Sequence, residues 1–464
     1  MSPEKLLVSA DVDRWLFGEA WTGSRIQEQV RMLCDTIGPR WSGTDAEWQT
    51  IEHIEKTLQG YGLDRVDVEE FEFTSWTWSK AEARCSVEGR EGGFSLDILP
   101  FIRCPSFHME APVVDVGFGA QREIDAAGSL NGVVALVALA HEPFTTPVPP
   151  AYRLRQIAAA GAAAAIVVDP KSGGRREYHS AQDARDPNFT EPPLPCVAAT
   201  REDAARIRRS PSCRVHLDVR TEAPVVKSAN VHAVLEGDRW PAEDLVLGGH
   251  HDTVFGTPGG NDNSSGTIAV LETARVLSQL RASCGQRPGR SIHFVTYAAE
   301  EQGFHGAREF VDRHYAGDHR LRLAFNLDEL SAGAMKGIVL GFPHLRSLVQ
   351  EQLDSMGDGL ACHVMAQLDN SSDHFPYLRI GIDAAHLWRW RFRARHADAD
   401  YHHEPPDTAD KLNVRELKEY AAQMSRLLLR LSRVAPDAWP QLGIPADEAK
   451  ARVQAEQGTV VRVS

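Results

Sequence analysis

The 464-residue sequence lacks the marks of a secreted or membrane-spanning protein. Its seven cysteines are scattered and never form a Cys-x-x-Cys pair, which argues against a disulfide framework and against a thiolate metal site. The longest apolar stretch, residues 157–168, is well short of the roughly 20 residues that cross a bilayer. The first thirty residues have no apolar core of the kind found in secretory signals. We therefore expect no membrane span and a cytoplasmic location.

Positive charge is also scarce. Fifty Lys and Arg residues stand against 64 Asp and Glu residues, which gives a net charge of −14. This balance argues against a chain-wide attraction to nucleic acid or to an anionic membrane. The hydrophobic share of 42% is ordinary for a globular protein, and the length predicts more than one folded unit.

The texture of the sequence changes along the chain. Apolar residues at three- and four-residue intervals predict helices at 24–37 and 44–58, and from about residue 228 buried strand candidates alternate with helical stretches, as in a sheet covered by helices. Between these parts lie Pro-containing segments and short apolar runs, which predict an inserted β-rich unit. The predicted domains are an N-terminal part at 1–104, an insert at 105–222, an α/β part at 223–434 and a tail at 435–464.

Acidic and imidazole side chains follow three successive strand candidates of the α/β part. The strand at 245–249 leads into His250 and Asp252, which point to the same side because side chains alternate along a strand. The strand at 292–297 is followed by Glu300 and Glu301. The strand at 323–327 is followed by Asp328, and a Gly- and Asn-rich loop before a helix carries Asp262. Open α/β sheets place their ligands at this edge.

Each of these pieces alone has an ordinary explanation, such as helix capping by Asp262 or a simple polar contact between His250 and Asp252. Together, the carboxylates would repel one another strongly unless protons or cations neutralised them. Imidazoles with carboxylates and no thiolate suit zinc or another first-row divalent ion better than calcium. With a late imidazole at His403, the set of possible ligands is large enough for two metal ions that share one carboxylate: His250, Asp262, Glu301, Asp328 and His403.

These motifs, in this order, resemble the co-catalytic di-zinc exopeptidases of metallopeptidase family twenty-eight, which include aminopeptidases and carboxypeptidase Q. The matching segments are His250-His251-Asp252, Asn261-Asp262-Asn263-Ser264-Ser265-Gly266, Glu300-Glu301-Gln302-Gly303, Asp328 and His403-Glu404-Pro405-Pro406-Asp407-Thr408, with Gly38-Pro39-Arg40 and Ser372-Asp373-His374 as further landmarks. The resemblance implies a phosphorylase/hydrolase-like three-layer α/β/α zinc-peptidase domain with a mixed central sheet. The insert is similar to a protease-associated domain.

The resemblance also implies roles for individual residues. It places one Zn²⁺ on His250 and Asp328, a second on Glu301 and His403, and Asp262 as the bridge between them. Asp252 then accepts a hydrogen bond from His250, and Glu300 is the general base that activates water. His402 is a second candidate beside His403, and we prefer His403 because its distance to Asp407 fits the family pattern.

The implied activity is zinc-dependent exopeptidase hydrolysis of peptides or dipeptides, by an aminopeptidase or a dipeptidase. Two alternatives stay open: an amidohydrolase or acyltransferase that acts on non-peptide N-acyl substrates, and a metal-free binding or receptor protein on the same fold. Strict alternation at 387–393 places three arginines on one face of a strand. This face is either a clamp for a peptide carboxylate or an exposed surface that could join two copies in a homodimer.

Overall fold

A computed structural model describes residues 8–89, 91–145, 148–181, 192–210, 212–317, 320–331, 333, 335–357, 362–387 and 401–455. The chain forms two compact units. Unit 1 contains residues 1–73, 227–391 and 405–453. Unit 2 contains residues 74–226 and two short later segments, of which 401–404 and 454–455 are described. No helix in the described ranges is long and apolar enough to cross a membrane.

Unit 1 is built on a mixed sheet, for which eight strands are described. In sheet order they are β1 (Arg65–Thr74), β10 (Val225–Leu235), β12 (Arg290–Tyr297), β11 (Trp240–His250), β13 (Leu321–Asn326), β16 (Ala384–Leu387), β14 (Gly337–Leu340) and β15 (His363–Ala366). The central strands β12, β11, β13 and β16 run parallel, whereas β10 and β14 are antiparallel to their neighbours β12 and β16. The mixed central sheet predicted from the family resemblance is confirmed.

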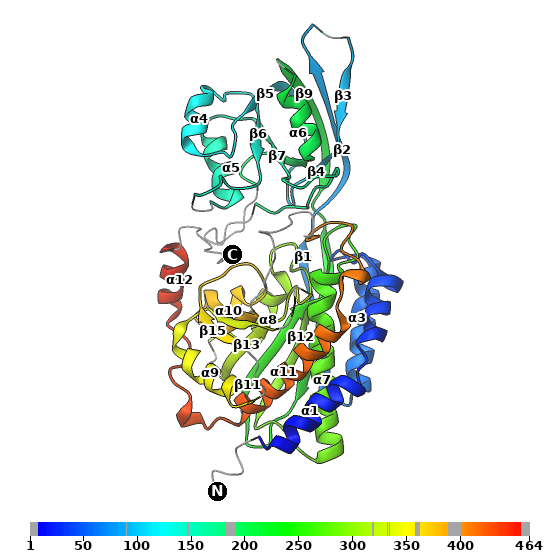
Figure 1. Cartoon of the computed structure of the whole chain (residues 1–464), viewed down its shortest axis with the longest axis vertical. Helices are drawn as coiled ribbons and strands as arrows, with labels where there is room; N and C mark the ends of the chain where they lie inside the picture. Colours follow the sequence, from blue (N-terminus) through cyan, green and yellow to red (C-terminus); the bar gives the residue numbers. More distant parts are fainter. Residues whose placement is uncertain are drawn as a thin grey trace. The chain divides into compact units, whose positions relative to one another are not determined.

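Helices cover both faces of this sheet, because its central strands are apolar on both sides. One group consists of α1 (Ala10–Thr22), α3 (Asp45–Gly60), α7 (Ser265–Cys284) and α11 (Val414–Arg433), which pack against one another and lie together on one side in Figure 1. On β12, Phe294 points to this group, whereas Tyr297 points the opposite way and contacts Phe310 of α8 (His305–Tyr315). The layers therefore stack as helix, sheet and helix.

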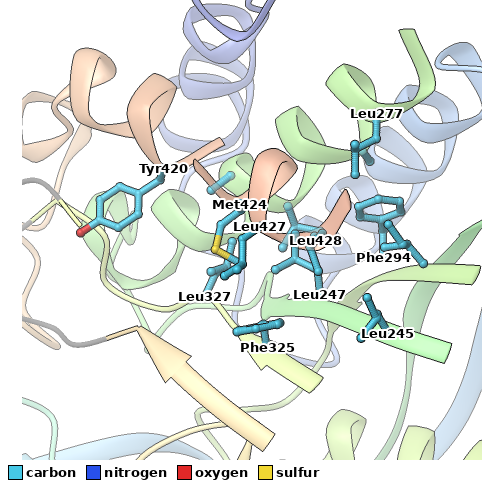
Figure 2. Close-up of a cluster of buried hydrophobic side chains, with 14 of the residues drawn as sticks. Leu245, Leu247, Leu277, Phe294, Phe325, Leu327, Tyr420, Met424, Leu427 and Leu428 are labelled. Carbon is cyan, nitrogen blue, oxygen red and sulfur yellow. The ribbon is translucent and has the colours of Figure 1, made fainter. Parts of the chain in front are cut away.

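Leucine and aromatic side chains fill the space between the sheet and the first helical layer. Figure 2 shows Leu247 and Phe325 of the sheet beside Leu427 and Leu428 of α11, all of them buried. Four further helical segments of unit 1 are α2 (Ile26–Val30), which continues into a π-helical turn at Arg31–Ile37, α9 (Arg346–Asp354), α10 (Phe375–Arg379) and α12 (Ala446–Ala455). This core fixes the positions of the central strands. It thereby also fixes the carboxyl ends of these strands, where the polar residues lie.

Unit 2 has its own sheet and its own apolar core. In sheet order its described strands are β3 (Gly93–Leu96), β2 (Thr77–Val87), β9 (Cys213–Glu222), β5 (Phe107–Asp115), β6 (Val134–Ala138), β7 (Ala164–Val168), β8 (Cys196–Ala199) and β4 (Ile98–Pro100). Its helices are α4 (Gln121–Ala127), α5 (Pro150–Ala159) and α6 (Arg201–Arg208).

The unit boundaries differ from the domain limits predicted from composition. Unit 2 begins at Thr74, not at residue 105, because β2 pairs with β9 over its whole length and so joins the second sheet. Residues 435–453, predicted as a tail, belong to unit 1, where Trp439 is buried. Most of the predicted arginine-bearing strand at 387–393 lies outside the described residues.

Truncating the core of unit 1 should destabilise it strongly. Leu247 is fully buried between the sheet and the helices, so Leu247→Ala removes apolar contacts and leaves a cavity. We expect a loss of about 2–5 kcal/mol in the free energy of unfolding, measured by urea denaturation. Val225→Ala, at a side chain that is 68% exposed, is the control and should change stability by less than about 0.5 kcal/mol. A similar small loss for Leu247→Ala would contradict this account of the core.

Candidate metal centre

Three parallel strands deliver the predicted residues to one edge of the unit 1 sheet. In the register of β11 and β12, His250 lies opposite Tyr297, directly before the turn that carries Glu300 and Glu301. On the other side of β11, Gly248 lies opposite Asn326, two residues before Asp328. Because the carboxyl ends of parallel strands meet at one edge, the fold brings residues distant in sequence into a single cluster.

The imidazole of His250 lies at the middle of this cluster. Its Nε2 atom is 3.3 Å from Asp262 Oδ1 and 3.5 Å from Asp328 Oδ1, and its Nδ1 atom is 3.4 Å from Asp252 Oδ1. A carboxylate oxygen of Glu300 lies 4.0 Å from the same Nε2 atom. All of these side chains are buried.

The spacing of the donors suits a tetrahedral metal ion. Two ligand atoms bound at about 2.0–2.1 Å to a tetrahedral zinc ion lie about 3.3–3.4 Å apart, close to the separations that His250 Nε2 makes with Asp262 and Asp328. One donor atom from each of these three residues falls within 4.8 Å of the others. The donor atoms of His250, Asp262 and Asp328 and the distances between them therefore suit a divalent first-row ion.

The electrostatics of the cluster point the same way. Burial raises the pKa of the Glu300 carboxyl well above its ordinary value, and the negative charges of Glu301 and Asp328 add to this effect, whereas His250 opposes it. Burial alone would lower the pKa of the His250 imidazole, but Glu300 and the neighbouring aspartates raise it well above its ordinary value. The cluster thus has a strong demand for positive charge, which a metal ion would meet in place of protons.

Asp252 connects two parts of the cluster. Besides contacting His250 Nδ1, its carboxylate accepts the backbone N–H groups of Glu300 at 3.2 Å and Glu301 at 3.4 Å. The same turn is held by Ser42, whose hydroxyl accepts the N–H of Ala299 at 2.9 Å. His250 Nδ1 also lies 3.2 Å from the backbone carbonyl oxygen of Asp252, so Asp252 orients the ring with Nε2 toward Asp262 and Asp328 and fixes the turn that carries the predicted base.

Asp407 holds the loop of Asp262 in place. Its buried carboxylate accepts the backbone N–H of Asn261 at 2.8 Å and that of Asp262 at 2.9 Å. From the other side, the Asn263 amide donates to the carbonyl oxygen of Leu327, the residue before Asp328, at 3.0 Å. These contacts couple the position of Asp262 to that of Asp328.

Arg40 forms a second support behind the site, and it is completely buried. Its guanidinium donates to Ser264 Oγ at 2.7 Å and to the carbonyl oxygen of Pro258 at 2.9 Å, and it also donates to the carbonyl oxygen of His251. One side chain from the N-terminal loop therefore ties the end of β11 to both ends of the Asp262 loop.

Asp407 and Arg40 lie in segments that match the family pattern, but the sequence predicted no role for either residue. Asp373 is a third such residue. Its carboxyl is fully buried, and neither of its oxygens has a hydrogen-bond partner among the described residues. Burial raises its pKa well above the ordinary value, and the charges of Asp252, Asp328 and Glu301 contribute. Periodicity could not reveal the roles of Arg40 and Asp407, since these arise from contacts between loops far apart in the sequence.

Glu301 and His403 are placed differently. Glu301 is buried in the turn beside Glu300, within electrostatic reach of the cluster. His403 belongs to unit 2, where its Nδ1 atom lies 2.9 Å from the carbonyl oxygen of Tyr178 and its ring stacks on His402 with the centroids 3.7 Å apart. The Tyr178 contact favours a proton on Nδ1 and a lone pair on Nε2. Ligation by His403 stays a prediction.

Comparisons with known proteins find similar sequences. Residues 230–428 match the model of peptidase family M28. The chain is 25% identical over 403 residues to the aminopeptidase YwaD of Bacillus subtilis, covering 84% of this chain and 80% of that protein. It is 23% identical over 433 residues to human carboxypeptidase Q, covering 90% of this chain and 86% of that protein.

Solved structures share the fold. A peptidase M28 precursor from Shewanella amazonensis superposes with a TM-score of 0.74 at 22% identity, over 93% of this chain and 98% of that one. A zinc aminopeptidase from Bacillus subtilis superposes with a TM-score of 0.66 at 21% identity, over 87% of this chain and 93% of that one. The α/β architecture of these structures is thus that of the present chain.

Removing one acceptor from Asp407 should weaken metal binding without unfolding the protein. In Asp407→Asn one of the two backbone N–H groups of the Asp262 loop loses its partner. We expect zinc affinity, measured by competition with a chromophoric chelator, to fall about 10–100-fold. Asp410→Asn, at an exposed carboxylate three residues away, is the matched control and should bind zinc as the unmodified chain does. Equal affinities for the two variants would show that Asp407 does not position the site.

Proposed function

We propose that this chain, which carries a peptidase family M28 domain at residues 230–428, is a zinc-dependent exopeptidase that acts as an aminopeptidase or a dipeptidase. The observation that carries the proposal is the buried arrangement of His250, Asp262 and Asp328 at zinc-ligand spacing, with the Glu300 carboxyl beside it. Relatives named aminopeptidase and carboxypeptidase Q, matched over most of their length, support the same class of activity.

Two zinc ions complete the proposed centre. His250 and Asp328 would hold one ion, Glu301 and His403 would hold the other, and Asp262 would be shared by both. In support, Asp262 lies where the loop fixed by Asp407 reaches the end of β11, and the Glu300–Glu301 turn is anchored on Asp252. When bound, the ions lower the pKa of a coordinated water molecule and polarise the carbonyl group of the scissile bond.

Glu300 is the proposed general base. Its carboxylate removes one proton from the attacking water, whose oxygen bonds to the carbonyl carbon of the substrate. The protonated carboxyl then gives this proton to the leaving amine as the C–N bond breaks, so the base returns to its starting state. The burial that raises the pKa of Glu300 makes its carboxylate a stronger proton acceptor, and this suits the first step.

This chemistry implies hydrolysis of an amide bond. A substrate screen distinguishes an aminopeptidase from a dipeptidase and from an amidohydrolase. Aminoacyl reporter amides, free dipeptides and N-acyl amino acids should be tested with and without a chelator. Hydrolysis of the reporter amides identifies an aminopeptidase, and hydrolysis confined to free dipeptides identifies a dipeptidase. Activity only on N-acyl amino acids would replace this proposal with an amidohydrolase.

Glu300→Gln separates metal binding from catalysis. The amide keeps the size of the side chain but cannot accept the proton, so we expect kcat to fall about 10²–10⁴-fold while the zinc content is unchanged. Glu301→Ala should instead lower the zinc content. Turnover is measured on the best substrate of the screen, and zinc by elemental analysis of the same samples.

Glu309→Gln on α8 is the control for an amide substitution at an exposed glutamate, and it should keep full activity. Near-normal turnover by Glu300→Gln would remove Glu300 from the role of base. Full loss of zinc in Glu300→Gln would make it a ligand instead.

A further inference from the structure

A second cluster of metal-binding side chains lies in unit 1, and none of its members belongs to the proposed zinc centre. Asp369 follows β15, His374 precedes α10 and His386 lies in β16. One donor atom from each lies within 4.8 Å of the others, and the two imidazole rings are 4.6 Å apart. His374 is 1% exposed, so this cluster is not an arrangement of solvated surface groups.

Hydrogen bonding accounts for Nδ1 of His386 but, among the described residues, for neither nitrogen of His374. His386 Nδ1 lies 3.0 Å from the carbonyl oxygen of Leu387, so it carries the proton and leaves a lone pair on Nε2. Neither ring nitrogen of His374 has a hydrogen-bond partner among the described residues. Its Nε2 atom is 3.6 Å from Asp369 Oδ1, which is too long for a hydrogen bond. A buried ring whose nitrogen atoms make no hydrogen bond is costly, and a bound ion would remove that cost.

A comparable set elsewhere in unit 1 is arranged differently. Glu69, His232 and His314 also bring one carboxylate and two imidazoles together. There the donors are hydrogen bonded to one another, since Glu69 Oε1 lies 3.0 Å from His232 Nδ1 and 2.8 Å from His314 Nε2. The Arg313 guanidinium lies 3.4 Å from Glu69 and supplies positive charge. This set is satisfied without an ion, and it serves as an internal control.

We propose that Asp369, His374 and His386 bind a further divalent ion of the zinc class, separate from the proposed zinc centre. Two imidazoles and one carboxylate form the ligand set of several three-ligand zinc sites, and they leave a fourth position for water or for a donor atom of a ligand. The site shares no residue with the other centre. It lies on the same sheet, because His386 pairs with Asn326, two residues before Asp328.

The test counts metal ions. The purified full-length chain and its variants are dialysed against zinc buffered at a fixed free concentration, and zinc per chain is measured by mass spectrometry. We expect Asp369→Asn to bind one equivalent less than the unmodified chain, and His386→Gln to show the same loss if Asp369→Asn fails to fold. His314→Asn, in the satisfied cluster, should lose none.

The zinc count for Asp369→Asn tests this site even if the proposed function is wrong. Glu301→Ala should lose zinc at the other centre, and combining it with Asp369→Asn should add the two losses. If the unmodified chain bound fewer ions than expected but Asp369→Asn still lost one, the two-zinc proposal would fail and this site would stand. Equal zinc content in the unmodified chain and in both Asp369→Asn and His386→Gln would overturn the site.

Discussion

The structure depends on holding several buried carboxylates close together at one edge of a sheet. Asp252, Asp262, Glu300 and Asp328 approach a single imidazole, His250, within 4.0 Å. Such a group repels itself in a low-dielectric interior. Burial raises the pKa of the Glu300 carboxyl well above its ordinary value, and the charges of Glu301 and Asp328 raise it further. The divalent ion of the proposed centre would offset this repulsion. The demand of the cluster for positive charge would then be the driving force for binding that ion.

The cluster keeps its geometry because its supports are rigid and are themselves buried. The register of the parallel strands β11, β12 and β13 sets the position of each polar residue along the sheet edge. The apolar core that packs against these strands holds them in place. Asp407 and Arg40 then hold the Asp262 loop through backbone groups, which have no rotamer freedom of their own. Residues placed in this way are oriented in advance, so that little ordering entropy would oppose the binding of the proposed ion.

Much of this could be predicted from the sequence, because buried strands and the polar residues directly after them leave a clear local pattern. The ends of the strands at His250, Glu300 and Asp328 were predicted in this way, and the family resemblance implied the three-layer fold. The supports at Arg40 and Asp407 depend on contacts between distant loops, which no local pattern reports. The start of unit 2 at Thr74 is equally absent from any local pattern, because the pairing of β2 with β9 joins segments more than a hundred residues apart.

Anomalous diffraction at the zinc absorption edge, from crystals of the chain grown with zinc, tests the central claim most directly. The account predicts a strong peak about 2.0–2.1 Å from His250 Nε2, with Asp262 and Asp328 as further ligands. Density for a zinc ion elsewhere, with no peak beside His250, would contradict it. In that case the buried carboxylates would have to be neutralised by protons, and the metal-dependent chemistry of this edge would be lost.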